Sequence, residues 1–315
     1  ADVRGQLQAR RALEVAAAGN HHVLLVGTPG CGKTLLASRL PGLLPEASED
    51  EALETAAIAS VSGRGLDHSR WRQRPYRSPH HTASAVALVG GGADPRPGEI
   101  SLSHNGVLFL DELPEWDRRA LEVLREPLES GTVTVSRAAR SSEFPARFQL
   151  VAAMNPCPCG WAGDPSGRCR CNPDAVRRYR ARISGPLMDR IDLHIEVPRL
   201  PPQDLRPDAP AGETTQAVRQ RVEAARAIQQ RRSGKPNAQL GQSETMAHCR
   251  LTDRDQALLE RAIERLQLSA RSMHRILRVA RTIADLSGEA DIATPHLTEA
   301  LGYRRVDRGI ARNAA

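Results

Sequence analysis

The sequence has 315 residues, which is enough for one hydrophobic core and a smaller neighbouring domain, because single cores stop growing near ~250–300 residues. Hydrophobic residues make up 40% and charged residues 26%, a balance that excludes a disordered chain, and the net charge of +7 is compatible with a polyanionic partner. No run of about 18 uncharged apolar residues occurs, so we exclude a membrane-spanning helix, expect no membrane partner and expect a cytoplasmic protein.

The first elements predicted along the chain are a helix, a strand and a second helix. Residues 3–18 carry apolar side chains at helical spacing. Residues 22–26 form a short, continuous apolar run, as expected of a parallel strand that is buried on both faces, and Gly27 ends it. Residues 33–40 resume a helical pattern, which completes a strand–loop–helix unit.

The middle of the chain contains a long insert and two more buried strands. Residues 60–100 are rich in Gly, Arg, Pro and His and show little periodicity, so we interpret them as an inserted, partly extended region. Residues 106–110 form the second buried strand, and residues 114–128 the helix that follows it. Residues 131–153 predict a β-hairpin that leads into a third buried strand, which ends at Met154.

A Pro-rich connector then leads into a segment that is helical in pattern throughout. Thr252 resembles the first residue of a capping box, Ser269 is a candidate cap for a long helix, and Thr294 begins the last helix. We therefore expect two domains, residues 1–198 and 199–315. The first has the pattern of an α/β nucleotide-binding domain with a parallel sheet flanked by helices, and the second that of an α-helical lid.

One segment matches the phosphate-binding pattern GxxxxGK[ST], and it lies between a predicted buried strand and a helix, where that pattern has mechanical meaning. Its glycines let backbone N–H groups close around the phosphates of ATP, its lysine reaches the β- and γ-phosphates, and its final threonine is a ligand of Mg²⁺. We expect this loop to bind nucleotide. Its residues are Gly27, Thr28, Pro29, Gly30, Cys31, Gly32, Lys33 and Thr34.

Hydrolysis also needs a carboxylate for the metal and a group that acts on water. Asp111 and Glu112 end the second apolar strand, so we expect Asp111 in the Mg²⁺ shell and Glu112 polarising the attacking water. Asn155 follows the third strand, where its amide can bond both the γ-phosphate and the water. By residue type alone, an Asp–Glu pair can also be a surface feature and a strand-ending Asn a turn residue.

Four of the six cysteines lie close together in the sequence, as two Cys-x-Cys pairs joined by a short polar loop. Tetrahedral Zn²⁺ with four sulfur ligands suits a loop that has no hydrophobic core of its own, although Cys-x-Cys is tighter than the usual Cys-x₂-Cys. We predict a structural zinc site, with metal-free thiols and an oxidation-sensing pair as the alternatives. The ligands would be Cys157, Cys159, Cys169 and Cys171.

Five stretches occur in the order seen in the magnesium-chelatase-like branch of AAA+ ATPases: GTPGCGKT, VLFLDELPE, AAMNPCPCG, ISGPLMDRIDL and SARSMHRILRVARTIADL. Within that branch the chain most resembles the ComM (YifB) family, above all through RPYRSPHHTASAVALVGGG and the four-cysteine insert. The resemblance spans nearly the whole chain. It implies a P-loop AAA+ fold and a homo-oligomer in the form of a hexameric ring. The activity it implies is that of an ATP-dependent DNA translocase or helicase, which promotes branch migration of recombination intermediates in natural transformation.

The resemblance also concerns the length of the chain. Members of the ComM family carry an additional N-terminal domain that resembles that of the Lon protease. This sequence starts without an initiator Met and without that domain, so we expect a piece of a longer protein.

Two arginines receive roles from the resemblance, position by position. It implies that Arg190 is an arginine finger that reaches the γ-phosphate on a neighbouring subunit, and that Arg271 is the second sensor of the lid. Arg182 and Arg275 are the alternates. An arginine supplied by a neighbour would make hydrolysis depend on the ring. For each of them, the structural alternative is a solvated charge or an ordinary ion pair.

Basic side chains in the predicted loops are the candidate contacts to DNA, single-stranded or branched. Contacts to backbone phosphates suit a motor, because every step must look alike, and aromatic residues are only 3% of the chain, so base stacking is not the expected grip. The same side chains can also be solvated charges that maintain solubility, and the preference for Arg over Lys is also typical of a GC-rich genome. The candidates are Arg74, Arg77, His80, His81, Arg137, Arg140, Arg168 and Arg170.

Two other functions compete with the DNA translocase. A magnesium-chelatase-type motor subunit, which remodels a partner protein, shares the core motifs, but those subunits lack the cysteine insert. A nucleotide-dependent scaffold would bind ATP with little hydrolysis, and the presence of Glu112 and Arg190 argues against it.

Overall fold

The structure is a computed structural model that describes residues 3–304, except residues 64, 66, 92–94, 138–139 and 207–211. The chain divides into two compact units. The first comprises Ala1–Leu44, Asn155–Arg180 and Ile191–Ala315, and the second comprises Pro45–Met154 and Ala181–Arg190. Along the described chain, no helix combines the length and the apolar character that crossing a membrane requires.

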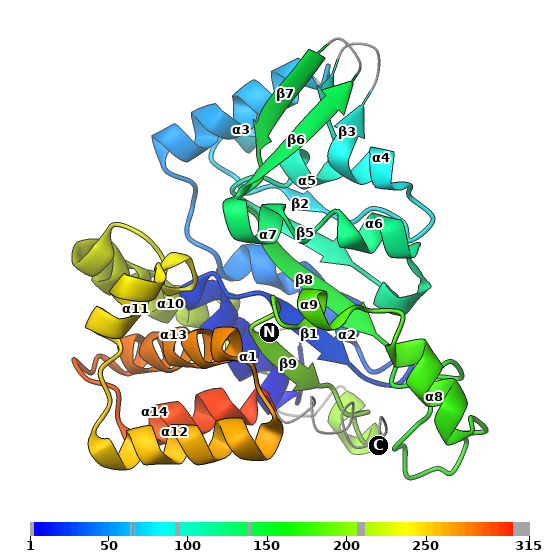
Figure 1. The fold of residues 1–315 in the computed structure, drawn as a ribbon, viewed down its shortest axis with the longest axis vertical. Helices are drawn as coiled ribbons and strands as arrows, with labels where there is room; N and C mark the ends of the chain where they lie inside the picture. Colours follow the sequence, from blue (N-terminus) through cyan, green and yellow to red (C-terminus); the bar gives the residue numbers. More distant parts are fainter. Residues whose placement is uncertain are drawn as a thin grey trace. The chain divides into compact units, whose positions relative to one another are not determined.

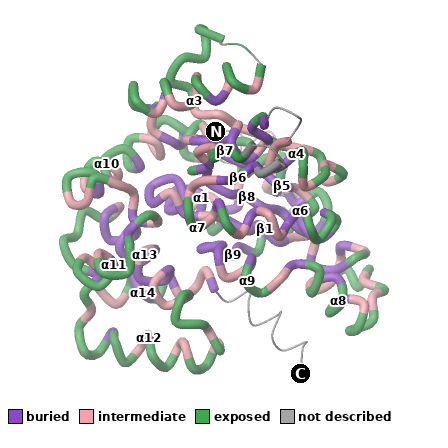
Figure 2. The backbone as a smooth tube through the Cα atoms, turned by 45° about the horizontal axis from the view of Figure 1, so that its top comes forward, coloured by how far each residue is buried: buried purple, intermediate pink, exposed green. Residues whose placement is uncertain are grey.

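The first unit contains two parallel strands, β1 (Val23–Val26) and β9 (Leu193–Glu196), with Val23 opposite Leu193. All of β1 and the first three residues of β9 are buried, as expected of strands covered on both faces (Figure 2). The helices of this unit are labelled in Figure 1. They are α1 (Leu7–Gly19), α2 (Lys33–Arg39), α8 (Pro173–Arg180), α10 (Thr215–Ser233), α11 (Gln242–His248), α12 (Asp253–Leu266), α13 (Ala270–Ser287) and α14 (Thr294–Gly302).

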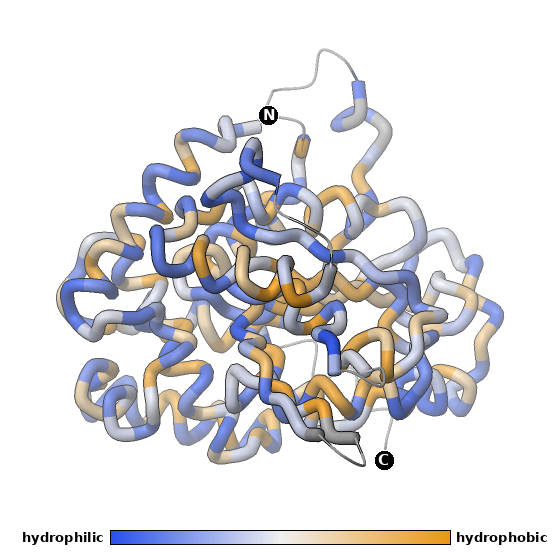
Figure 3. Tube along the Cα trace, turned by 90° about the horizontal axis from the view of Figure 1, so that it is seen from above, coloured by the Kyte–Doolittle hydropathy of each residue, from blue (hydrophilic) through white to orange (hydrophobic). Residues whose placement is uncertain are grey.

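The helix α13 packs against α1, α10, α11 and α14. It begins where the side chain of Ser269 accepts the backbone N–H of Ser272, and it ends at Gly288, which has a φ of 72°. Helix α12 is exposed over most of its length (Figure 2). Hydrophobic and hydrophilic residues follow one another along the helices in Figure 3, as expected of helices with one buried face.

The second unit contains three parallel strands, β2 (Tyr76–Arg77), β5 (Val107–Leu110) and β8 (Gln149–Met154), and all of β5 and β8 is buried. Two antiparallel pairs accompany them. These are β3 (Gly90–Gly91) with β4 (Arg96–Pro97), and β6 (Thr132–Arg137) with β7 (Arg140–Pro145). The helices are α3 (Glu49–Val61), α4 (Ala85–Val89), α5 (Glu99–Leu102), α6 (Arg118–Glu122), α7 (Pro127–Ser130) and α9 (Gly185–Met188).

The parallel strands lie in the order β2-β5-β8 in the second unit, and β1 pairs with β9 in the first, with helices in both units. This confirms the predicted α/β class with a parallel sheet, and helices α10 to α14 confirm the helical C-terminal region. The predicted strands at residues 22–26, 106–110 and 131–153 all form, the last as the hairpin β6–β7 followed by β8. The division into domains at residue 198 stays a prediction.

The predicted continuous helix over residues 114–128 is wrong, because the segment breaks into a 3₁₀ turn, α6 and α7. The carboxylate of Asp117 accepts the N–H groups of Arg119 and Ala120 and so begins a new helix. Pro127 has no N–H to continue it. The first helix also begins later than predicted, at Leu7.

Several elements carried weaker signals in the sequence. Helix α3 begins with a reciprocal capping box between Ser48 and Glu51, and the strands β2 and β9 are only two and four residues long. The caps predicted in the C-terminal region are confirmed. Thr252 accepts the N–H of Asp255, Ser269 caps α13, and Thr294 begins α14.

A buried ion pair joins Asp192, the residue before β9, to α13 within the first unit. The carboxylate of Asp192 accepts a hydrogen bond from the guanidinium of Arg275 at 2.7 Å and another from the backbone N–H of His22 at 2.9 Å. Burial by itself would raise the pKa of Asp192, but Arg275 and the imidazole of His21, 3.7 Å away, hold that pKa well below its usual value. The pair therefore stabilises the fold above about pH 4, and this contribution is lost as the pH falls through the lowered pKa.

We expect Arg275→Met to lower the free energy of unfolding at pH 7 by roughly 3–5 kcal/mol, because it leaves a buried carboxylate without its cation. The loss should shrink at pH 5, where a buried, unpaired Asp192 takes up a proton more readily. Urea denaturation followed by circular dichroism at the two pH values measures both effects. The double variant Asp192→Asn/Arg275→Met is the control and should recover most of the loss. Equal stability of the single and double variants at pH 7 would contradict the assignment.

Candidate active site and metal centre

The predicted phosphate-binding loop follows β1 and leads into α2. A Cβ at Gly27 would lie 2.4 Å from the carbonyl oxygen of Val197 and 2.6 Å from the sulfur of Cys31, so this position is crowded. Gly30 and Gly32 have φ values of 75° and 95°, and a Cβ there would meet nothing within 4 Å. Crowding therefore requires glycine at the first position, and backbone conformation requires it at the other two.

The ammonium group of Lys33 is buried inside this loop. Its Nζ donates to the carbonyl oxygens of Gly27 at 2.7 Å and Thr28 at 3.0 Å, and to Oδ1 of Asn155 at 3.1 Å. Two residues that the sequence assigned to the same site, Lys33 and Asn155, thus lie in direct contact. Neutral oxygens satisfy the ammonium here, and an anionic phosphate would be a stronger partner.

The loop also contains a hydrogen-bonding group that lacks a protein partner. The hydroxyl of Thr28 is buried and has no partner among the residues that the structure describes. This unsatisfied group, the buried ammonium of Lys33 and the open space at Gly30 and Gly32 fit a chain of phosphates. The residues of the loop therefore suit ATP.

Sequence reasoning missed Gln6, which fixes the loop from one side. Its Nε2 donates to the carbonyl oxygens of Cys31 at 3.3 Å and Pro198 at 2.7 Å. Gln6 is buried and has a φ of 50°, which is uncommon for a residue other than glycine. No local pattern marks such a residue, because its partners are distant in the sequence.

Asp111 and Glu112 follow β5, as predicted. The carboxylate of Asp111 accepts the N–H of Glu112 at 2.8 Å, and its carbonyl oxygen accepts the indole N–H of Trp116 at 2.9 Å. Glu112 has a φ of 51°, a conformation that persists in a non-glycine residue only where its surroundings fix it. The backbone of this pair is therefore held in place, while the carboxylate of Glu112 is half-exposed.

His81 contacts that carboxylate. Its Nδ1 lies 3.0 Å from Oε2 of Glu112, within the second unit. The sequence suggested His81 as a DNA contact, and nothing in the sequence near Glu112 pointed to this pair.

Arg190 lies among groups of its own unit. Its guanidinium donates to the carbonyl oxygens of Arg125 at 3.0 Å and Pro186 at 2.7 Å, and it forms an ion pair with Glu129 at 2.7 Å. The residue is 5% exposed, so it would have to leave these partners to reach another subunit. The alternate, Arg182, has a side chain that is 55% exposed.

Arg271 and Arg275 lie in successive turns of α13. Arg271 lies in the first turn and is exposed, whereas Arg275 is buried against Asp192. Of these two, only Arg271 presents its side chain at the surface of the chain.

Two arginines among the candidate DNA contacts are also engaged by carboxylates. Arg74 lies 2.8 Å from Glu51, and Arg77 binds both oxygens of Glu99, at 2.6 and 2.8 Å. Both guanidinium groups are only partly exposed. They stiffen the base of the predicted insert, and a phosphate would have to compete with their present partners.

The other arginine candidates lie in two places. Arg168 stacks on the ring of Trp161, with its guanidinium carbon 4.8 Å from the ring centre, and Arg170 is exposed. The backbones of Arg137 and Arg140 form the last pair of the β6–β7 register, where β6 ends and β7 begins. Their side chains lie outside what the structure describes.

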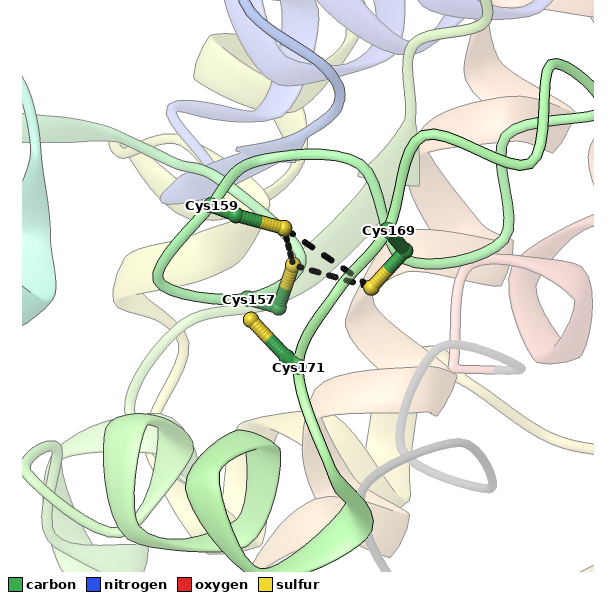
Figure 4. A group of neighbouring side chains, drawn as sticks. All are labelled: Cys157, Cys159, Cys169 and Cys171. Carbon is green, nitrogen blue, oxygen red and sulfur yellow. Dashed lines mark hydrogen bonds between the residues drawn. The ribbon is translucent and has the colours of Figure 1, made fainter.

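Four cysteine sulfurs converge in the loop that follows Asn155 (Figure 4). The sulfur of Cys157 lies 3.4 Å from that of Cys159 and 3.8 Å from that of Cys169, and all four, with Cys171, lie within 4.8 Å of one another. Tetrahedral zinc with Zn–S bonds of about 2.3 Å requires sulfur separations of about 3.8 Å. All six cysteines of the chain are unpaired thiols, so these four form no disulfide.

Backbone N–H groups favour the thiolate form of Cys159. The N–H groups of Arg170 and Trp161 lower the pKa of Cys159 to about 6, and the N–H of Ala162 donates to the sulfur of Cys157 at 3.2 Å. Such N–H···S bonds are typical of the surroundings of bound metal ions. The four residues therefore fit Zn²⁺, which would supply structural cross-linking to a loop with little core of its own.

Two family models match the chain. The model described as "Magnesium chelatase, subunit ChlI" matches residues 1–205, and the model of the ChlI C-terminal region matches residues 212–304. The chain belongs to this family. The match confirms the resemblance to magnesium-chelatase-like AAA+ proteins.

Similarity to individual proteins supports the same family assignment. The "Competence protein ComM" of Haemophilus influenzae is 54% identical over 98% of this chain, and the YifB protein of Escherichia coli is 53% identical over the same share. The chain spans about 60% of the length of each. More distantly, the "MCM-type protein MJ0961" of Methanocaldococcus jannaschii is 26% identical over 55% of the chain and 19% of its own length.

One contact links the cysteine loop of this ChlI-family chain to its phosphate-binding loop. Gly160 has a φ of 84°, and a Cβ there would lie 2.7 Å from the ring of Pro29. The side chain of Asn155 lies next to the same position, at 3.8 Å. The backbone of the cysteine loop therefore packs directly on the phosphate-binding loop.

We expect the purified protein to contain about one zinc ion per chain by elemental mass spectrometry, because four thiolates converge at tetrahedral spacing. Cys169→Ser/Cys171→Ser should abolish binding, since it removes half of the ligands. Cys249→Ala is the matched control, because that thiol is buried elsewhere and burial raises its pKa to about 12. A protein that stays metal-free after reconstitution with zinc under reducing conditions would overturn this prediction.

We expect Gly160→Ala to weaken ATP binding about tenfold, because the new methyl group overlaps Pro29 and overpacking costs ~1–3 kcal/mol. Gly163→Ala is the control. Gly163 has a φ of 80° in the same loop, but a Cβ there would meet nothing within 4 Å. Both variants carry the backbone strain, and only the first displaces the phosphate-binding loop. Titration with a fluorescent ATP analogue measures the affinities, and equal values for the two variants would rule out the contact as the cause.

Proposed function

We propose that this chain is the ATPase module of a hexameric DNA translocase or helicase that promotes branch migration of recombination intermediates in natural transformation, in the cytoplasm. The observation that carries the proposal is the buried ammonium of Lys33, held between the phosphate-binding loop and Asn155. An ammonium group in this position can bind the phosphates of a nucleoside triphosphate. Membership of a magnesium-chelatase-like AAA+ family supports the same reading.

Different residues have different roles in the proposed hydrolysis. Lys33 binds the β- and γ-phosphates, Glu112 polarises the attacking water, and Asn155 orients that water. Thr34 and Asp111 would hold Mg²⁺, which neutralises charge on the phosphates.

An arginine from a neighbouring subunit completes the site, which is why turnover requires a ring. We assign this role to Arg190, with Arg182 as the alternate whose side chain is already exposed. Arg271, exposed in the first turn of α13, is assigned as the second sensor.

Two features support DNA as the partner. A relative that is 54% identical is named a competence protein, and other similar proteins are named MCM-type. The net charge of +7 is suited to a polyanion, and Arg168 and Arg170 extend from the cysteine loop. Phosphate contacts of this kind carry no sequence preference, as a translocase requires.

The second candidate function is that of a magnesium-chelatase-type motor subunit that remodels a partner protein. The description of the matched family favours it. Both candidates hydrolyse ATP, and they differ in whether DNA changes the rate.

We expect ATP hydrolysis by the purified protein to be stimulated by single-stranded or branched DNA. The stimulation should decline steeply between about 50 and 200 mM salt, because phosphate contacts release counterions. Steady-state phosphate release with and without DNA measures it. Lys33→Ala should lose ATP binding, and Glu112→Gln should bind ATP with a kcat about 10²–10⁴-fold lower.

Three outcomes separate the readings. Hydrolysis that DNA does not change would favour the chelatase-type motor. Tight binding of ATP without turnover at any protein concentration would favour a scaffold. Turnover that does not depend on self-association would exclude the arginine from a neighbour.

A further inference from the structure

The second unit contains a cavity of about 210 Å³ between α3, residues 67–77 and α5. Among the described residues that line it, none is assigned to the binding or hydrolysis of ATP. A cavity of roughly 150 Å³ already accommodates a benzene ring. The space is therefore large enough for one flat ring system of the size of a nucleobase.

One wall of the cavity is formed by small side chains of α3. Ala52, Ala56 and Ala59 line it, and residues with this spacing lie on one face of a helix. Each contributes only a methyl group, so the wall leaves space that longer side chains would fill. Ala57 lies between them in the sequence, but it is exposed on another face of the helix.

The facing segment carries an aromatic ring and a guanidinium group. Trp71 lines the cavity and is 36% exposed. Arg72 has a φ of 65°, a conformation that its surroundings must fix. Two hydrogen bonds do so, because the N–H of Ala47 donates to the Arg72 carbonyl oxygen at 3.0 Å and Nε of Arg72 donates to the Ala47 carbonyl oxygen at 2.8 Å. Trp71 is therefore held at the cavity by a constrained backbone.

Positive charge is in excess along this segment. Arg70 and Arg72 both line the cavity, and within the described part of the chain neither forms an ion pair with a carboxylate. Asp67 also lines it, but its carboxylate accepts hydrogen bonds from the backbone N–H and the hydroxyl of Ser69. The two guanidinium groups can accordingly bind an anion such as a phosphate.

The cavity also has an unsatisfied hydroxyl group in its lining. Ser101 of α5 is fully buried, and its hydroxyl has no hydrogen-bond partner among the residues that the structure describes. Buried polar groups are normally hydrogen-bonded, so this one fits a ligand that carries an acceptor. The edges of nucleobases carry such acceptors, whereas an aliphatic side chain of a protein partner has none.

We propose that this cavity binds a nucleobase, and that the base is an unpaired one of single-stranded DNA, stacked on Trp71 and hydrogen-bonded at its edge by Ser101. Arg70 and Arg72 then lie beside the adjoining phosphate. DNA as the source of the base rests on the proposed function. Every base has a flat face, so stacking on one ring tolerates any sequence, as a translocase requires. Contacts to phosphates still hold the rest of the strand, in keeping with an aromatic content of only 3%.

The test compares an end-labelled oligothymidine with an abasic oligonucleotide of the same length, which has the phosphates but no bases. We expect the wild type to bind oligothymidine roughly 5- to 100-fold more tightly, the range for stacking on an aromatic side chain, measured by fluorescence anisotropy. Trp71→Ala should remove most of this difference by weakening the binding of oligothymidine alone. Ala56→Leu should do the same, because the longer side chain fills the cavity. Ala57→Leu is the matched control on the exposed face of α3 and should keep both affinities.

Ser101→Ala separates a role in binding from a role in folding. Because the hydroxyl has no protein partner in the described structure, its removal should leave the melting temperature unchanged or raised. The affinity for oligothymidine should nevertheless fall several-fold, and that for the abasic strand should stay the same. A loss of stability with unchanged affinity for oligothymidine would overturn the role of Ser101.

The failure of the base site and the failure of the proposed function give different results. Equal binding of the two strands by the wild type, or a difference that survives in Ala56→Leu, would overturn the base site while DNA stays the partner. If neither strand binds, DNA is excluded, and deoxythymidine monophosphate decides the site. Quenching of tryptophan fluorescence that is lost in Trp71→Ala and in Ala56→Leu would support the cavity as a site for a free nucleotide, and the absence of quenching would overturn it.

Discussion

Parallel strands of this protein are buried on both faces, and this burial restricts where polar site residues can lie. Every residue of β1, β5 and β8 is buried, so the candidate site residues lie in the segments that follow each strand. The phosphate-binding loop follows β1, Asp111 and Glu112 follow β5, and Asn155 follows β8.

This constraint explains why much of the candidate site was predictable. A buried strand is a continuous apolar run, and the residue after it can be read directly from the sequence, as for Asp111 and Asn155. The phosphate-binding loop and the two Cys-x-Cys pairs are local patterns too. The contact between Lys33 and Asn155 joins two such predictions, and the convergence of the four sulfurs agrees with the spacing of their pairs.

What sequence reasoning missed depends on pairing between distant segments. The contact of His81 with Glu112 needs the register of β2 on β5, and the burial of Arg190 needs Glu129 and the Arg125 carbonyl. Neither is encoded near the residue concerned. The predicted helix over residues 114–128 failed for a different reason, since its apolar spacing was helical but Pro127 outweighed it. The spacing of apolar residues indicates which face of a segment is buried. It does not indicate whether the helical backbone hydrogen bonds continue along the whole segment.

The phosphate-binding loop is held by segments that are distant in the sequence. Gln6 fixes the carbonyl oxygen of Cys31, and Gly160 packs against Pro29. Because Gly160 follows directly on Cys159, a change in the cysteine cluster is transmitted to Pro29 through a single peptide link. A Cβ at Gly160 would lie 2.7 Å from the ring of Pro29, so the contact leaves no space for a side chain. The geometry of the nucleotide loop is therefore set by elements outside the motif that defines it, which is why the motif alone predicts binding but not its regulation.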